Sequence, residues 1–260
     1  MTPDPRAAPL VRVAIVGVTG RMGQALLRAA PAFSQLIVTG AVASPASLAL
    51  GRDAGELIGI GPTNLKVSSD LPRALADADV AIDFSQPAAT RTNLAACRAA
   101  RKALLIGTTG LEAGLEAALA AAAREIAVLS APNTSIAVAL LMQLVRASAA
   151  ALPGTFDMNI LEMHHRGKRD APSGTALALR AAAAAGRGSP EGQIGIASVR
   201  AGDLPGEHTV FFSGPGEQLS LSHRASDRAI FARGALTAAL WLASRPPGHY
   251  SMSDFIEQKT

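Results

Sequence analysis

Short apolar runs alternate with alanine-rich stretches through the first half of the chain. Each run is nearly continuous and contains β-branched residues, as expected for strands that are covered on both faces of a parallel sheet. Helices in the alanine-rich stretches would supply that cover, which is the pattern of consecutive βαβ units. The predicted strands are Val11 to Gly17, Leu36 to Ala43, Val80 to Phe84, Ala103 to Gly107 and Ile126 to Ser130.

The pattern changes after a predicted helix from Ile136 to Ala151 and the turn Leu152-Pro153-Gly154. Strand-like runs then follow one another with one strong helix between them, Thr175 to Ala185, before a closing helix from Phe231 to Ser244. This order favours an α+β arrangement over further βαβ units. The predicted strands of this part are Phe156 to Met163, Ile194 to Val199, His208 to Ser213 and Gln218 to Ser222.

The pattern as a whole predicts an α/β fold, with a Rossmann-like, doubly wound parallel sheet and a second α+β domain. Residues 11–133 and 235–260 would form the first domain and residues 134–234 the second, while residues 1–10 would be a disordered leader. In open parallel sheets, ligands bind beyond the carboxyl ends of the strands. The loops that begin at Gly17, Ser85, Gly107 and Ala131 are therefore the candidate ligand loops.

Composition excludes several function classes. Although 49% of the 260 residues are hydrophobic, no run reaches the roughly 18 to 20 apolar residues of a membrane span. The pI is about 9.8, but the net charge is only +4 and 3% of the residues are aromatic, so no nucleic-acid partner is expected. The N-terminal residues lack the layout of a secretory signal. The single cysteine, Cys97, is expected to be a small buried residue in a reducing cytoplasm.

The turn after the first predicted strand reads Gly17-Val18-Thr19-Gly20-Arg21-Met22-Gly23 and leads into a helix. In a nucleotide-binding turn, Gly17 would allow the tight turn, Gly20 the approach of a pyrophosphate, and Gly23 the close packing of helix on strand. The N–H groups at the helix start would hold the phosphates, with Arg21 beside them. The spacing G-x-x-G-x-x-G is a weak signal by itself, and a plain turn is the alternative.

Cofactor preference depends on the end of the second predicted strand. A site that prefers NAD has an acid there, which binds the ribose hydroxyls, but this chain has Ala43 followed by Ser44. Loss of the acid removes repulsion against a 2′-phosphate, so NADPH should be tolerated. Two further loops, Gly107-Thr108-Thr109-Gly110 and Ala131-Pro132-Asn133-Thr134-Ser135, could line a nicotinamide pocket, although each is also consistent with ordinary turn chemistry.

The segment from Glu162 to Thr175 has the most unusual composition. Five of the six residues from His164 to Arg169 are potential cations, more than a short connection between a strand and a helix needs. Ser173, Gly174 and Thr175 start the next helix, where hydroxyls and backbone N–H groups can hold a carboxylate. With His165 nearby, this cradle could bind a substrate with two carboxylates, while His164 and Lys168 suit proton delivery. No metal is expected, because adjacent histidines on a strand point to opposite sides and no ligand set is complete.

The same segment, Glu162-Met163-His164-His165-Arg166-Gly167-Lys168-Arg169-Asp170-Ala171-Pro172-Ser173-Gly174-Thr175-Ala176, resembles the signature E-x-H-H-x-x-K-x-D-x-P-S-G-T-A of 4-hydroxy-tetrahydrodipicolinate reductases. Further stretches are similar to this family in the same order, so the likeness covers nearly the whole chain beyond the leader. They are Val16 to Gly23, Ile82 to Ser85, Ile106 to Gly110, Ala131 to Ser135, Val199 to Asp203 and Gly206 to Thr209.

The resemblance implies an NADPH- and/or NADH-dependent reductase of a small dicarboxylate in diaminopimelate and lysine biosynthesis. His164 would be the proton donor or acceptor and Lys168 the acid that completes reduction, while His165, Gly174 and Thr175 would bind the substrate carboxylates. The second domain would bind substrate and build a homotetramer through its open mixed sheet. The cofactor would contact Gly17, Val18, Thr19, Gly20, Arg21, Met22, Gly107, Thr108, Thr109, Ala131, Pro132, Asn133 and Thr134.

Family members commonly carry an acid followed by a basic residue where this chain has Ala43 and Ser44, so the resemblance leaves cofactor preference open. The resemblance also implies that His208, His223 and Arg224 are structural or interface groups. Two other functions remain. Another amino-acid-pathway dehydrogenase, acting on aspartate or homoserine, would share the nucleotide half. A non-catalytic nucleotide sensor would have no use for clustered acid–base groups.

Overall fold

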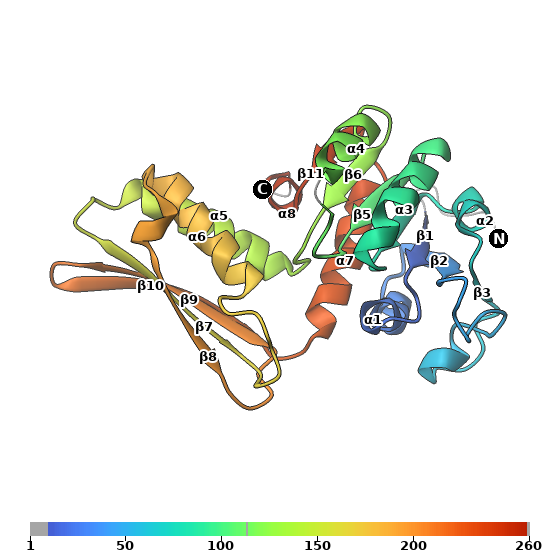
Figure 1. The fold of residues 1–260 in the computed structure, drawn as a ribbon, viewed down its shortest axis with the longest axis horizontal. Helices are drawn as coiled ribbons and strands as arrows, with labels where there is room; N and C mark the ends of the chain where they lie inside the picture. The colour runs from blue at the N-terminus through green and yellow to red at the C-terminus, as the bar shows by residue number, and fades with distance from the viewer. Residues whose placement is uncertain (1–9, 113, 259–260) are drawn as a thin grey trace. The chain divides into compact units, whose positions relative to one another are not determined.

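The computed structural model describes residues 10–112 and 114–258, and the predicted leader of residues 1–10 lies outside them except for Leu10. The chain divides into two compact units (Figure 1). Unit 1 contains the residues up to Thr134 and those from Phe231 onward, and unit 2 runs from Ser135 to Ile230. Thr134 and residues 231–234 therefore fall in unit 1, whereas the sequence predicts them in the second domain.

Unit 1 is built on a seven-stranded sheet with the order β11-β6-β5-β4-β1-β2-β3. Every pairing in it is parallel, which confirms the predicted doubly wound sheet. The strands are β1 (Val11–Val16), β2 (Leu36–Val42), β3 (Val67–Ser68), β4 (Val80–Asp83), β5 (Ala103–Ile106), β6 (Ala127–Ser130) and β11 (Gly248–Tyr250).

Helices cover both faces of this sheet, because its strands are apolar on both sides. Alternate residues of β1 point to opposite faces, so Ala14 and Val16 join the core under α2, α3 and α4, while α1 and α7 lie on the other face (Figure 1). The helices are α1 (Arg21–Ala29), α2 (Leu71–Ala76), α3 (Pro87–Ala99), α4 (Leu115–Ala122), α7 (Ala229–Leu242) and α8 (Met252–Glu257), with short 3-10 turns at Ala30–Ala32 and Glu56–Ile58.

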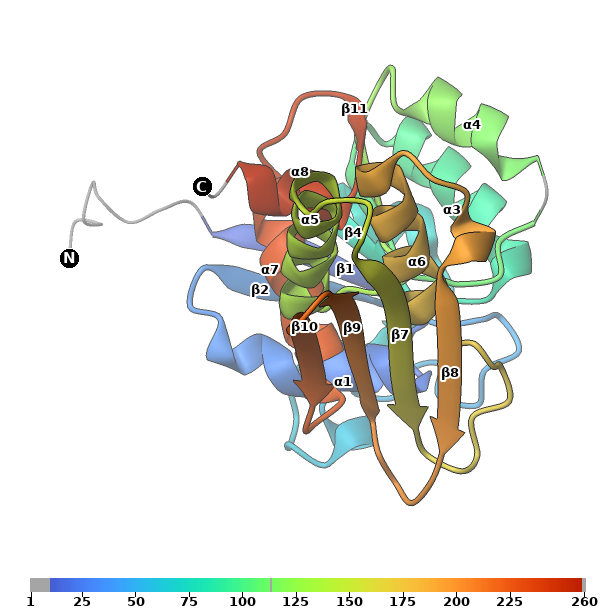
Figure 2. The ribbon, with the colours of Figure 1, turned by 90° about the vertical axis from the view of Figure 1, so that its left-hand side faces the viewer.

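Unit 2 is a four-stranded sheet with the order β10-β9-β7-β8, and Figure 2 shows the four strands side by side. β7 is antiparallel to β9 and parallel to β8, so the sheet is mixed, as predicted. The strands are β7 (Asp157–His164), β8 (Gly195–Arg200), β9 (Gly206–Gly214) and β10 (Glu217–Ala225), and the helices are α5 (Ile136–Ala151) and α6 (Gly174–Arg187), with a 3-10 turn at Glu191–Gln193.

The core of unit 2 lies between its sheet and its two helices. Ile160 of β7 and Phe212 of β9 are 2% and 0% exposed, and they pack with Val145 of α5 and Leu179 of α6 in one apolar cluster. The alternation of buried and exposed residues along β7 and β9 follows from this single covered face. Among the described residues, no helix is long and apolar enough to cross a bilayer.

Candidate functional site

The turn between β1 and α1 is shaped so that only glycine fits at its key positions. Gly17 has φ +83°, and a Cβ there would lie 2.5 Å from the carbonyl oxygen of Phe84. A Cβ on Gly23 would lie 2.3 Å from the carbonyl oxygen of Gly17. Gly20 is the N-cap of α1 and provides no side chain to cap its first turn. The N–H groups of that turn are thus suited to bind an anion, as expected for a dinucleotide pyrophosphate.

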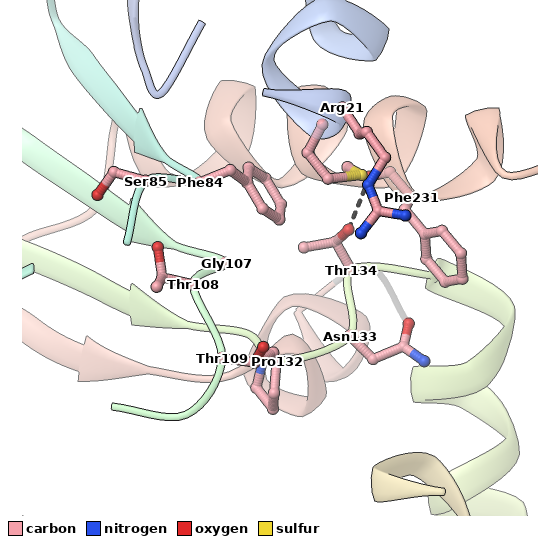
Figure 3. Close-up of a pocket in the computed structure, with 11 residues that line it drawn as sticks. Arg21, Phe84, Ser85, Gly107, Thr108, Thr109, Pro132, Asn133, Thr134 and Phe231 are labelled. Atoms are coloured by element: carbon pink, nitrogen blue, oxygen red, sulfur yellow. Dashed lines mark hydrogen bonds between the residues drawn. The ribbon is translucent and has the colours of Figure 1, made fainter. Parts of the chain in front are cut away.

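A pocket of about 430 Å³ gathers loops from the carboxyl ends of β1, β4, β5 and β6 (Figure 3). It lies around the point where the strand order reverses, between β1 and β4, which is where open α/β sheets bind ligands. The first residue of the unit 1 return segment, Phe231, also lines it, and Thr134 donates a hydrogen bond of 2.7 Å to the Phe231 carbonyl oxygen. The lining residues are Arg21, Met22, Phe84, Ser85, Gly107, Thr108, Thr109, Pro132, Asn133, Thr134 and Phe231.

A buried carboxylate fixes two of these loops. Asp83, at the end of β4, is 0% exposed. Its Oδ1 accepts a hydrogen bond of 2.8 Å from the backbone N–H of Ser85, and its Oδ2 one of 3.0 Å from Asn93 Nδ2. The Thr108 hydroxyl donates to the Asp83 carbonyl oxygen at 3.3 Å. These bonds set the positions of Ser85 and Thr108 in the pocket wall.

A second pocket of unit 1, of about 660 Å³, extends from the glycine turn to the end of β2. Gly17, Thr19 and Gly20 line one side of it, and Ala43 and Ser44 line another. The described residues that line this pocket include no acid and no base. The adenine-ribose end of a dinucleotide would therefore meet small, neutral groups here.

Eleven of the thirteen residues predicted to contact the cofactor line one of these two pockets. The two that do not, Val18 and Ala131, are 0% and 2% exposed. The backbone N–H of Val18 donates to the Val42 carbonyl oxygen at 3.0 Å and is not available for a phosphate. Val18 and Ala131 therefore support the loops from beneath.

In unit 2, the end of β7 carries a buried carboxylate, Glu162, which forms an ion pair with Arg200 and also contacts His164. Glu162 and His164 are two residues apart on the strand and share a face, and they are 0% and 8% exposed. Glu162 Oε2 lies 2.5 Å from His164 Nδ1. Arg200, opposite His164 in the pairing of β7 with β8, donates from Nη1 and Nη2 to the two Glu162 oxygens at 2.9 and 2.6 Å. The backbone N–H of Ser173 also donates to Glu162 Oε1, at 3.2 Å.

This environment perturbs three titratable groups. Burial alone raises the pKa of Glu162, but hydrogen bonds from Arg200, Ser198 and His164 lower it to about 2, so the group is a carboxylate. Burial lowers the pKa of His164 below its usual value, although Glu162 opposes the shift. Burial also lowers the pKa of His208 on β9 to about 4, with the nearby His164 adding to the effect.

The segment after β7 folds back over this ion pair. Lys168 Nζ lies 2.9 Å from Asp170 Oδ2, with the lysine side chain 21% exposed, and the backbone N–H of His165 donates to the Leu204 carbonyl oxygen. Ser173 is the N-cap of α6, since its hydroxyl accepts from the N–H of Ala176 at 3.1 Å.

Unit 2 thus groups most of the predicted catalytic and substrate-binding residues. Gly174 and Thr175 form the first turn of α6, directly after the capped Ser173. The Ser173 hydroxyl also lies 3.1 Å from His208 Nε2. The connection from β7 to α6, which Glu162 holds together, therefore carries five of these residues. They are His164, Lys168, Ser173, Gly174 and Thr175.

A metal ion is one alternative explanation for this cluster. Ligand atoms of Glu162, His164 and His208 lie within 4.8 Å of one another, so the grouping uses His208 and not the neighbouring His165. Both Glu162 oxygens, however, already accept hydrogen bonds from Arg200. A cation would have to displace that guanidinium from a fully buried carboxylate, which is costly.

Several residues of the site carry no prediction from the sequence. Glu162 stands in the quoted motif without a role, although its spacing of two from His164 on a strand indicates a shared face. Arg200 meets Glu162 in unit 2 only through tertiary structure. In unit 1 the same holds for Asp83 and Phe231, which meet Thr108 and Thr134. His208, for which a structural or interface role is expected, is 4% exposed, and its ring lies edge-on to that of His164 at 5.1 Å.

Comparison with protein families gives two matches that together span most of the chain. The family described as dihydrodipicolinate reductase, N-terminus, matches residues 11–134, and the family described as dihydrodipicolinate reductase, C-terminus, matches residues 137–256. A 4-hydroxy-tetrahydrodipicolinate reductase of Alkalilimnicola ehrlichii is 47% identical, over 94% of this chain and 98% of its own. One from Anaeromyxobacter dehalogenans is 44% identical, over 95% of this chain and 98% of its own.

A solved structure of a reductase of this name has a similar fold. Dipicolinate-bound dihydrodipicolinate reductase from Paenisporosarcina sp. TG-14 superposes with a TM-score of 0.77 at 25% identity, covering 93% of this chain and 97% of that one. An amine dehydrogenase from Mycobacterium smegmatis gives a TM-score of 0.63 at 14% identity, covering 94% of this chain and 95% of that one. At that identity the second likeness shows the fold alone.

Proposed function

The chain belongs to the dihydrodipicolinate reductase family, and we propose that it reduces 4-hydroxy-tetrahydrodipicolinate to tetrahydrodipicolinate with NADPH or NADH. This reaction, with its loss of water, belongs to diaminopimelate and lysine biosynthesis. Relatives that are 44% to 47% identical over nearly their whole length carry the name of this activity. The observation that carries the proposal is the buried Glu162–His164 pair beside Lys168 at the start of α6, because a nucleotide domain alone would suit many dehydrogenases.

The residues of unit 1 fit a dinucleotide. The Gly17 turn and the uncapped first turn of α1 suit a pyrophosphate. The neutral pocket at Ala43 and Ser44 would hold the adenosine end, and the pocket around Thr108 and Thr134 the nicotinamide end. When bound, the cofactor supplies a hydride to the substrate.

The residues of unit 2 fit the rest of the chemistry. The substrate has two carboxylates, and His165 with the first turn of α6 at Ser173, Gly174 and Thr175 would bind them. Lys168, as a cation, would stabilise negative charge that develops on the ring. His164 would transfer a proton through the ring nitrogen that does not face Glu162.

The reaction requires one hydride and one proton after loss of water. Elimination of the 4-hydroxyl group leaves a conjugated imine, a hydride then forms a new C–H bond at ring C4, and the electron pair moves toward nitrogen as an enamine. Protonation of the enamine carbon then restores the imine. We propose that Lys168 is the acid in this step and that His164 accepts or donates the proton. The acid and base must be held close to the ring. His164 ends the strand β7, and the side chain of Lys168 pairs with Asp170.

A coupled assay tests this function. The purified chain is added to a dihydrodipicolinate synthase reaction, and the oxidation of NADPH or NADH is followed by absorbance. We expect turnover with the synthase product and none with aspartate semialdehyde or homoserine. His164→Ala and Lys168→Ala should lose roughly 10²- to 10⁴-fold in kcat while cofactor affinity is kept. Near-normal rates in both variants would contradict the role assignment.

We also propose that the chain acts in the cytoplasm as a homotetramer, as the family resemblance implies. The sheet of unit 2 has helices on one face only, and the other face would be available to a second copy. Light scattering coupled to size-exclusion chromatography measures the mass directly, and a value near the 26.4 kDa of one chain would contradict the proposal.

A further inference from the structure

Glu162 contacts His164, Arg200 and Ser173, although the sequence assigns it no role. It is fully buried, and its two oxygens accept hydrogen bonds from His164 Nδ1, from both terminal nitrogens of Arg200 and from the backbone N–H of Ser173. A carboxylate has about four acceptor positions, so these contacts, together with the hydrogen bond from Ser198, use its whole capacity. The Glu162 carboxylate therefore cannot contact the substrate, and it acts on the reaction only through the residues that bind it.

From this geometry we propose that Glu162 and Arg200 are positioning residues that fix His164 in one tautomer, with Nδ1 protonated and Nε2 as the atom that transfers the proton. The expected effect on kcat rests on the proposed function. The protonation of His164 Nδ1 rests on the structure alone.

The tautomer follows from the partner of Nδ1. An ionised carboxylate can only accept hydrogen bonds, and Arg200 donates to both oxygens of Glu162, which keeps the group ionised. The 2.5 Å contact therefore requires that Nδ1 of His164 is the donor. Nε2 is then the atom that can accept a proton when the ring is neutral, or donate one when the ring is cationic. It lies against Gly206, where a Cβ would be only 2.9 Å away, so the absence of a side chain there leaves room for the ring.

Arg200 extends the same control to the lysine. Besides binding Glu162, its Nη2 donates to the backbone carbonyl oxygen of Asp170 at 2.6 Å. The side chain of Asp170 in turn pairs with Lys168 at 2.9 Å. One guanidinium thus contacts the two residues that pair with the proton-transfer groups, Glu162 for His164 and Asp170 for Lys168. A lysine lacks the planar fork that makes these contacts together.

The charges around His164 determine the expected pH effect. Glu162 raises the pKa of His164, whereas burial, Lys168 and Arg200 lower it, and the buried His208 faces the ring from β9. Loss of the Glu162 charge would leave only the groups that lower the pKa. The pH dependence of kcat/KM that reports His164 should then move to lower pH in Glu162→Gln.

The test combines nitrogen NMR of the histidine rings with the coupled assay. In the wild-type chain with ¹⁵N-labelled histidine, the neutral ring of His164, assigned by its loss in His164→Ala, should show protonated Nδ1 and unprotonated Nε2. In Glu162→Gln this preference should be lost, and kcat should fall by roughly 10²-fold with little change in the Kd of NADPH. Arg200→Lys keeps the positive charge and should give a loss of the same kind. A matched control is Glu191→Gln, which removes a carboxylate from the exposed pair with Arg180 in the same unit and should leave all readouts unchanged.

The outcomes separate the two proposals. An inactive wild-type chain would refute the proposed function, while its NMR spectrum would still decide the tautomer. A wild-type His164 with Nε2 protonated would overturn the positioning proposal without use of any variant. So would a Glu162→Gln or Arg200→Lys variant that folds, binds NADPH and keeps wild-type kcat and pH profile.

Discussion

The buried His208 should make unit 2 sensitive to mild acid. Burial lowers its pKa from 6.5 to about 4, so between these values the unfolded chain binds a proton that the folded chain does not. The stabilisation from the neutral buried ring is complete above about pH 6.5 and declines as the pH falls toward 4. The whole shift corresponds to about 3 kcal/mol, of which about 2 kcal/mol is lost by about pH 5.

His208→Gln removes the titrating group and keeps a side chain that can bond to Ser173. Hydrogen–deuterium exchange of β7 and β9 in increasing urea, at about pH 7.5 and about pH 5, gives the free energy of opening of unit 2 at each pH. Between about pH 7.5 and about pH 5, the free energy of opening of unit 2 should fall by about 2 kcal/mol more in the wild type than in the variant. His164 and His223, whose pKa values are also lowered by burial, add to the loss in both proteins and cancel in the comparison.

The exposed His249 in unit 1 provides the control, because His249→Gln should leave the acid sensitivity of unit 2 unchanged. A His208→Gln variant that loses as much free energy as the wild type would refute the reasoning. It would mean that the ring of His208 is not kept neutral by its surroundings.

Three further predictions concern unit 1. Gly17→Ala should raise the Kd of NADPH by roughly 10-fold or more, because its Cβ would meet the Phe84 carbonyl at 2.5 Å. Gly51→Ala, with a similar φ of +79° but no atom within 4 Å, is the control in calorimetric titrations. Ala43→Asp should lower the NADPH-to-NADH ratio of kcat/KM by roughly 10-fold through repulsion of a 2′-phosphate, and an unchanged ratio would remove Ala43 from the adenosine pocket. Cys97, 0% exposed and with its pKa raised by burial to about 12, should resist thiol reagents in the folded chain, and rapid labelling at neutral pH would contradict its burial.

The apolar pattern predicts most elements closely, for a physical reason. The five first-half strands all form, and the helix predicted from Ile136 to Ala151 has these bounds. Strands buried on both faces, and helices with a continuous apolar stripe, leave a strong signal in sequence. The short edge strands β3 (Val67–Ser68) and β11 (Gly248–Tyr250) leave too little signal, since two or three residues carry no periodicity.

Residue chemistry alone indicated the candidate site, because unusual groups lie together in the sequence. The glycine turn at Gly17 and the charged segment from His164 to Thr175 are continuous in the chain, so their composition is visible without a fold. Tertiary structure was needed to bring Arg200 from β8 and His208 from β9 to the end of β7.

The sequence by itself determined the class of fold and the residue types that can do the chemistry, because burial periodicity and local motifs act over short stretches of chain. Only the tertiary structure decided which charge faces which. Glu162, one of several acids in the sequence, becomes the shared partner of His164, Arg200 and Ser173 only in the folded chain. The pairing of β7 with β8 brings Arg200 beside it from 38 positions away, and the start of α6 brings Ser173. The protonation of a buried group depends on such neighbours, and no local pattern records them.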